Sequence, residues 1–253
     1  MISRRRFLRT GLAITAALVL GRPGRVIAGA FPQFSISQVR YRGGQWDPNP
    51  QFIDAITQEL ELRTSIDALK ERRTITLSDP ELFSCPFLYM AGRYEFEPFS
   101  AQEREALRRY LTFGGFILAE DVAGIKGFGF DAAFRREMKQ IFPANDMLKL
   151  SPDHSVFQSF YLINTIGGRQ RINAYLEGVV IDNWTPVIYS QNDLAGAWSR
   201  DRSGKWLNEC VPGGEAQRLA AFKLGINIIV YSLTSDYKKD LVHHPFIRRR
   251  QNL

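Results

Sequence analysis

The chain has 253 residues, enough for one domain with a single core, and its 45% hydrophobic and 23% charged content is typical of a globular protein. The formal net charge is +7, but residues 1–30 hold six arginines and no acid, which leaves 27 basic against 26 acidic residues elsewhere. The basic character therefore belongs mainly to the amino terminus, and it gives no reason to expect nucleic-acid binding.

The first 30 residues have the three parts of an export signal: arginines at 4–6, a short apolar stretch at 12–20, and small residues at 28–30. The SRRRFLR stretch resembles a twin-arginine translocation signal. The small residues at 28–30 predict cleavage after Ala30. The resemblance implies a mature protein in the periplasm or outside the cell, free of the membrane. An uncleaved anchor is the alternative, although the apolar stretch is short for a hydrocarbon core of about 30 Å.

Twin-arginine export suits a protein that folds around a cofactor, but the common cofactor and metal motifs are missing from this sequence. Residues 124–129 (GIKGFG) are glycine-rich, yet their arrangement after a strand is wrong for a dinucleotide fingerprint, and we expect a mobile loop. We predict neither a cofactor nor a metal site. Cys85 and Cys210 could form a disulfide in an oxidising compartment, or could be two separate buried thiols.

Strands and helices are predicted to alternate along the mature chain, residues 31–238, which a basic tail at 239–253 follows. The predicted strands are, in order, 34–41, 74–77, 87–90, 116–119, 148–150, 176–181 and 187–189. The predicted helices are 49–62, 100–111, 130–141 and 215–233. This order favours an α/β fold with a mostly parallel sheet covered on both faces, to which the last two strands add a hairpin.

The clearest unit is the strand, helix and strand within residues 85–121. Ser100 and Glu103 have the spacing of a capping box, which predicts the start of the helix. The second strand of the unit ends at Glu120 and Asp121. Since ligands bind at the carboxyl ends of parallel strands, these acids are expected to lie at a binding edge.

Five segments in this order carry a family resemblance: CPFLYMAG, FSAQEREALRRYLTFGGFILAED, PDHSVF, VIYSQNDLAGAW and AFKLGINIIVYSLT. Together they resemble a bacterial family catalogued as domain-of-unknown-function family 4159, over residues 34–234. The resemblance implies a flavodoxin-like fold of the class I glutamine-amidotransferase-like superfamily, and it implies no established reaction. In that superfamily the amidotransferases carry a nucleophilic cysteine on a strand-to-helix turn. Here the comparable turn carries Glu120 and Asp121, so we exclude glutaminase chemistry.

Acids and a histidine are the candidates for chemistry. Strand alternation sends Glu120 and Asp121 to opposite faces, and we favour Asp121 as a general base or as a ligand for a sugar hydroxyl. Capping of the following loop is the alternative for Asp121. His154 follows Asp153 and is the best general acid or base in the sequence. A loop histidine bonded to backbone is the alternative there.

Ligand-binding candidates occupy the loops after the first and third strands. Gly43 and Gly44 would let backbone N–H groups approach a ligand, and Trp46 would offer a platform for a sugar ring. Gly92 and Arg93 would hold an anion at the next strand end. The alternatives are packing of the indole over the sheet edge and a surface ion pair of the arginine. Glu120 is a further ligand-binding candidate.

Two functions follow from these residues. The first is an exported domain that binds a carbohydrate or a cell-envelope protein through a cleft without a nucleophilic cysteine. The second is a hydrolase or isomerase acting on carbohydrate, with Asp121 and His154 as its acid/base pair. We favour the first, because an enzyme requires both side chains to reach one substrate.

Overall fold

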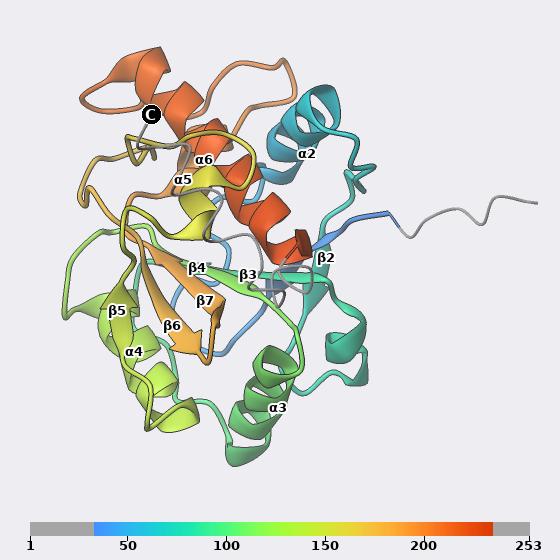
Figure 1. The fold of residues 1–253 in the computed structure, drawn as a ribbon, viewed down its shortest axis with the longest axis vertical. Coiled ribbons are helices and arrows are strands. Elements are labelled where there is room, and N and C mark those ends of the chain that lie inside the picture. Colours follow the sequence, from blue (N-terminus) through green and yellow to red (C-terminus); the bar gives the residue numbers. More distant parts are fainter. Residues whose placement is uncertain (1–32, 235–253) are drawn as a thin grey trace, which may run out of the picture. The chain divides into compact units, whose positions relative to one another are not determined.

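The structure, a computed structural model, describes residues 33–234 and contains a seven-stranded sheet in the order β2-β1-β3-β4-β7-β6-β5 (Figure 1). The parallel strands are β1 (Ile36–Val39), β2 (Arg73–Ile75), β3 (Phe87–Gly92), β4 (Ile117–Asp121) and β7 (Trp184–Ser190). Strand β6 (Glu177–Ile181) is antiparallel to β7 and to β5 (Met147–Lys149). The predicted mostly parallel sheet with an added hairpin is confirmed.

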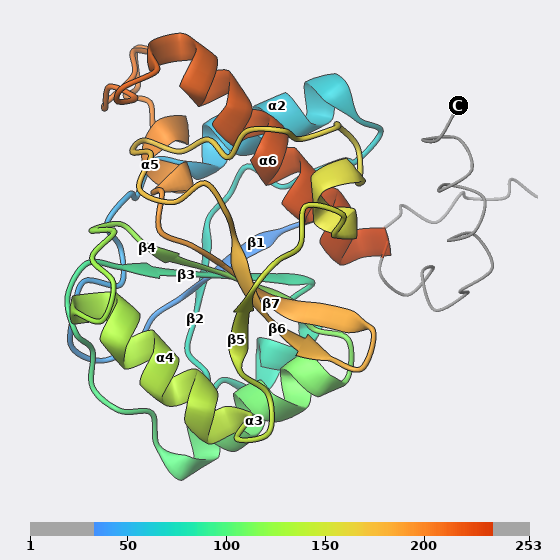
Figure 2. The same ribbon diagram turned by 60° about the vertical axis from the view of Figure 1, so that its left-hand side comes forward.

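Helices cover both faces of the sheet (Figure 2). One face carries α2 (Ile53–Arg63), α5 (Leu194–Trp198) and α6 (Gly214–Thr234), and the other carries α3 (Ala101–Thr112) and α4 (Gly129–Ile141). Two short 3₁₀ turns, η1 (Pro80–Ser84) and η2 (Ser155–Gln158), lie in the connections. The three layers, helices on either side of the sheet, explain why the central strands are apolar throughout, since both of their faces are buried.

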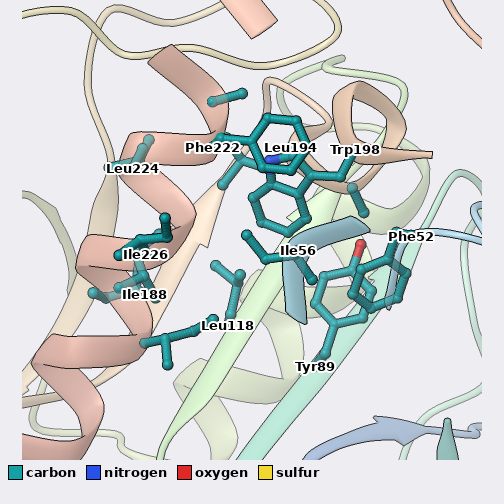
Figure 3. Packing of buried hydrophobic residues seen from close by; sticks show 14 of the residues in the cluster. Phe52, Ile56, Tyr89, Leu118, Ile188, Leu194, Trp198, Phe222, Leu224 and Ile226 are labelled. Atoms are coloured by element: carbon teal, nitrogen blue, oxygen red, sulfur yellow. The ribbon is translucent and has the colours of Figure 1, made fainter. Parts of the chain in front are cut away.

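Each face of the sheet has its own hydrophobic core. On the α6 side, Phe52, Tyr89 and Trp198 belong to a core that Figure 3 shows from close by. Alternate residues of the same strands, such as Leu88 and Met90 of β3, enter the second core under α3 and α4. Because side chains alternate along a strand, successive residues of one apolar strand enter different cores.

Local signals fix the helix positions. The capping box is confirmed: the Ser100 amide donates to the Glu103 carboxylate at 2.7 Å, and the Glu103 amide donates to Ser100 Oγ at 3.2 Å. In α6, a Cβ on Gly225 would lie 2.4 Å from the Trp198 ring, so the close packing of α6 on α5 requires a glycine there.

The prediction that Leu62 packs against the core is wrong. Leu62 is 72% exposed, because it follows the buried Leu60 by two residues and so lies about 200° around the helix.

Cys85 and Cys210 are free, buried thiols that belong to cores on opposite faces of the sheet. The alternative of two separate thiols is therefore the one observed.

The predicted export signal and the basic tail lie outside the described residues. Among residues 33–234, no helix combines the length and the apolar character needed to span a bilayer.

Candidate functional site

The carboxyl ends of four parallel strands meet at one edge of the sheet, here called the carboxyl edge. Gly92 of β3 pairs with Asp121 of β4, and Glu120 of β4 pairs with Ser190 of β7. The loops that follow β1, β3, β4 and β7 therefore leave the sheet side by side. This edge is where a ligand of a parallel sheet is expected.

Glu120 is fully buried on the α6 side of this edge. Tyr89 Oη, the Leu194 amide and the Ala195 amide donate hydrogen bonds to its carboxylate at 2.8, 2.7 and 3.1 Å. Burial raises the pKa of the Glu120 carboxyl to about 8, and the charge of Asp193 adds to the rise. Its hydrogen bonds tie the first turn of α5 to strand β4, so Glu120 acts as an anchor between elements.

Asp193 caps the same short helix from a left-handed backbone conformation, with φ of 54°. Its Oδ1 accepts hydrogen bonds from the Gly196 amide at 3.0 Å and from Asn49 Nδ2 at 2.7 Å, and its Oδ2 is paired with the Arg169 guanidinium. One buried carboxylate thus joins the β7–α5 loop to the segment before α2 and to the loop that precedes β6.

Asp121 lies on the opposite face from Glu120, as strand alternation predicts. It accepts hydrogen bonds from the Ala123 and Ile125 amides, each at 3.0 Å, and from Gln191 Nε2 at 3.3 Å. Burial raises its pKa above the usual range. These contacts are those of the loop-capping alternative for Asp121.

Asp131, in the first turn of α4, holds the other end of the loop 122–128. It accepts hydrogen bonds from the Gly127 amide at 2.6 Å and from Tyr189 Oη at 2.8 Å, and it is paired with Arg135 at 2.8 Å. The glycine-rich loop, which the sequence led us to expect to be mobile, is bonded at both ends to buried carboxylates.

Large apolar side chains are exposed on this loop and on the segments beside it. Their exposed fractions are 61% for Tyr94, 54% for Ile125, 72% for Phe128 and 46% for Ile172. We call these four residues the rim patch. Single exposed apolar residues are common on protein surfaces, whereas a group of them on adjoining loops points to a contact surface.

Two close approaches show that the rim patch is built from adjoining segments. A Cβ on Gly124 would lie 2.6 Å from the Ile172 side chain, and a Cβ on Gly129 would lie 2.6 Å from the carbonyl oxygen of Arg93. The same segments carry cations that form no ion pair with any residue the structure describes: Arg93, Lys126 and Arg171. The surface around the rim patch is therefore both apolar and basic.

Gly43 and Gly44 lie beside the segment after β3. Both have left-handed φ values, 71° and 56°, and a Cβ on either would come within 3.1 Å of the backbone of residues 94–97. Trp46 is half-buried, with the Arg72 guanidinium 5.5 Å from the ring centroid, and Arg72 is also paired with Asp47 at 2.7 Å. The indole thus follows its packing alternative, and Arg72 covers one ring face.

Gly92 is covered by aromatic side chains. A Cβ at this position would lie 2.2 Å from Tyr41 Oη and 2.5 Å from the Phe130 ring. The Tyr41 hydroxyl donates to the Ala91 carbonyl at 2.8 Å, which holds its ring in place. The glycine is thus required by packing at the end of β3, while the neighbouring Arg93 is half-buried at the rim.

His154 lies at the other edge of the sheet. Its Nδ1 accepts a hydrogen bond from the Val156 amide at 3.2 Å, and its Nε2 lies 3.0 Å from Thr185 Oγ1, near the start of β7. Asp121 follows Glu120, which pairs with Ser190, five residues beyond Thr185 on β7, or about 17 Å at strand spacing. The structure does not bring His154 and Asp121 to one substrate, and the backbone contact matches the loop-histidine alternative.

Several residues of the carboxyl edge were not candidates in the sequence. Asp131 and Arg135 have the i, i+4 spacing of a helical ion pair, and Asp193 precedes a short apolar segment as an N-cap does. Asn49 and Arg169 gave no comparable signal. In the part of the chain described, no group of three or more His, Cys, Asp or Glu side chains is placed to hold a metal ion.

The family comparison agrees with the resemblance seen in the sequence. The family model described as "Domain of unknown function (DUF4159)" matches residues 35–233, which is most of the chain. No curated protein matches the chain.

Proposed function

The chain belongs to this family of domains of unknown function, and we propose that it is an exported binding domain that holds a cell-envelope protein at the carboxyl edge of its sheet. The contact surface in this proposal is the rim patch with Arg93, Lys126 and Arg171 around it. The partner that fits this surface presents acidic side chains around an apolar centre.

The proposal depends on one observation: the acids of the carboxyl edge are buried and bonded to the backbone of the chain. Glu120, Asp121 and Asp131 are fully buried, and each accepts hydrogen bonds from the backbone of the loops or helices around it. A general base must reach a substrate proton, directly or through one water. Acids that hold loops in place suit a binding surface better than they suit a hydrolase or an isomerase.

The strand order supports the proposed fold family. The five parallel strands follow the order β2-β1-β3-β4-β7, which corresponds to the flavodoxin-like order 2-1-3-4-5. This order fits an amidotransferase-like sandwich whose β4 turn has acids where a nucleophilic cysteine would be. Cys85 precedes β3, at the edge opposite the candidate site, and so supplies no nucleophile there.

Between a carbohydrate and a protein partner, the surface favours the protein. Trp46 was the candidate platform for a sugar ring, and Arg72 covers one face of its indole. Exposed Phe128 and Ile125, on the segments that carry Arg93 and Lys126, match the composition of protein interfaces. The proposed location beyond the inner membrane follows from the arginine motif at residues 4–6, and it makes a cell-envelope protein the natural partner.

Site-specific crosslinking tests the proposal. A photoreactive phenylalanine replaces Phe128 in the full chain, and a discrete adduct with one protein is expected in cells that export it. Reversal of Arg93 and Lys126 to Glu should weaken binding of the partner at least tenfold, which is about 1.4 kcal/mol of binding free energy. The yield of the adduct should fall with it. The control places the same residue at Leu62 on α2, which is 72% exposed. Equal adducts at both positions, or an adduct that survives charge reversal, would contradict the proposal.

A further inference from the structure

A cavity of about 270 Å³ opens at the edge of the sheet opposite the rim patch, where β3 and β4 begin. It lies between the turn η1 and the carboxyl end of α3. Its lining consists of Phe83, Ser84, Cys85, Pro86, Tyr110, Phe113, Gly114 and Gly115. Cavities of this size hold a small molecule or the head group of a larger one. None of the residues discussed above for the carboxyl edge contributes to it.

Aromatic rings form the walls of this cavity. Phe83 and Phe113 are 52% and 79% exposed, although both are large apolar side chains. Tyr110 is buried, and its hydroxyl donates to the carbonyl oxygens of Cys85 at 2.9 Å and Phe116 at 3.2 Å, which fixes its ring. Exposed aromatic faces such as those of Phe83 and Phe113 attract organic cations.

Two charges act on the cavity, the partial negative charge at the end of α3 and the positive charge of Arg109 at its border. The cavity lies at the carboxyl end of α3, where the helix dipole places partial negative charge. No acid and no cation contributes to the lining. At its border the Arg109 guanidinium lies 5.6 Å from the centroid of the Phe83 ring, so one aromatic wall already attracts a cation of this chain.

From these observations we propose that the cavity is a binding site for an organic cation, a quaternary ammonium or guanidinium group, held by Phe83 and Phe113 over the end of α3. Arg109 competes for the same aromatic face from outside the cavity. The cation could belong to a free small molecule or to an arginine side chain of another protein, and both present the same chemistry. The site is independent of the proposed function of the carboxyl edge.

The test compares choline with 3,3-dimethylbutan-1-ol, the neutral isostere in which carbon replaces nitrogen. Binding to the full chain is followed by ligand-observed NMR titration. Choline should bind, and the alcohol should bind at least about tenfold more weakly, since only the cation interacts with the aromatic faces. N-acetylarginine amide forms the second arm. Tighter binding of this compound than of choline would identify a protein side chain as the source of the cation.

Variants locate the binding. Phe113→Ala should weaken choline binding about fivefold, while Arg109→Gln should strengthen it by removing the competing charge. The matched control is Phe160→Ala, which removes an exposed aromatic side chain in the loop after η2, outside the cavity lining, and should leave choline binding unchanged. Equal affinity for the alcohol, no measurable binding of either cation, or an equal loss in Phe113→Ala and Phe160→Ala would overturn the proposal.

Discussion

Raising the pH from about 5 to about 9 should lower the free energy of unfolding, and Glu120→Gln should remove most of this decline. Burial raises the pKa of the Glu120 carboxyl from 4.5 to about 8 in the folded chain. Between these values the folded state binds more protons than the unfolded state, so stability falls as the pH rises. The contribution is fully present below pH 4.5 and is lost as the pH rises through about 8.

The slope is at most about 1.4 kcal/mol per pH unit, so the whole shift corresponds to an upper limit of about 5 kcal/mol. Urea unfolding at a series of pH values, followed by tryptophan fluorescence, measures how the free energy of unfolding changes with pH. Asp121→Asn is the matched control, because the pKa of Asp121 is also raised by burial but Glu120 remains in place. A flat wild-type profile, or the same slope in Glu120→Gln, would show that Glu120 stays ionised in the folded protein.

Replacing Asp131 by Ala should lower the free energy of unfolding by about 3–5 kcal/mol, as expected when one partner of a buried ion pair is removed. Asp131 is fully buried, whereas Arg135 would keep only its pairing with Glu177. The Tyr189 hydroxyl and the Gly127 amide would also lose their acceptor. Urea unfolding at neutral pH gives the change.

Asp146→Ala provides the comparison for Asp131→Ala. Asp146 is paired with Lys139 at 2.7 Å, but both side chains are more than half exposed, at 70% and 59%. Solvent screens such a pair, and its removal should cost less than about 1 kcal/mol. Losses of the same size in the two variants would mean that the Asp131 cluster does not hold the loop 122–128 in the folded protein.

Features that depend on neighbouring residues could be predicted from the sequence. The capping box at Ser100 depends on three residues of spacing, and the opposite directions of Glu120 and Asp121 depend on the strand period alone. The alternation of apolar strands with amphipathic helices was also sufficient to predict the mostly parallel sheet. These signals depend only on residues close together in the sequence, so they predict local structure without knowledge of the tertiary contacts.

The composition of the site depended on contacts between distant segments. Asn49 and Asp193 are 144 residues apart in the chain and form one hydrogen bond. His154 was paired with Asp121 in the sequence because both side chains suit acid/base chemistry, but the direction of β7 places Thr185, and His154 with it, at the other edge. Strand order and register decide which loops lie side by side, and the local patterns of the sequence did not predict them.

Amide hydrogen exchange tests most directly whether the buried acids anchor the surface. In the wild-type protein, the Leu194 and Ala195 amides, bonded to Glu120, and the Ala123 and Ile125 amides, bonded to Asp121, should exchange slowly. Glu120→Gln should accelerate only the first pair, and Asp121→Asn only the second. Rapid exchange of all four amides in the wild-type protein would show that the carboxylates are free, which would contradict the anchoring role and favour a reactive one.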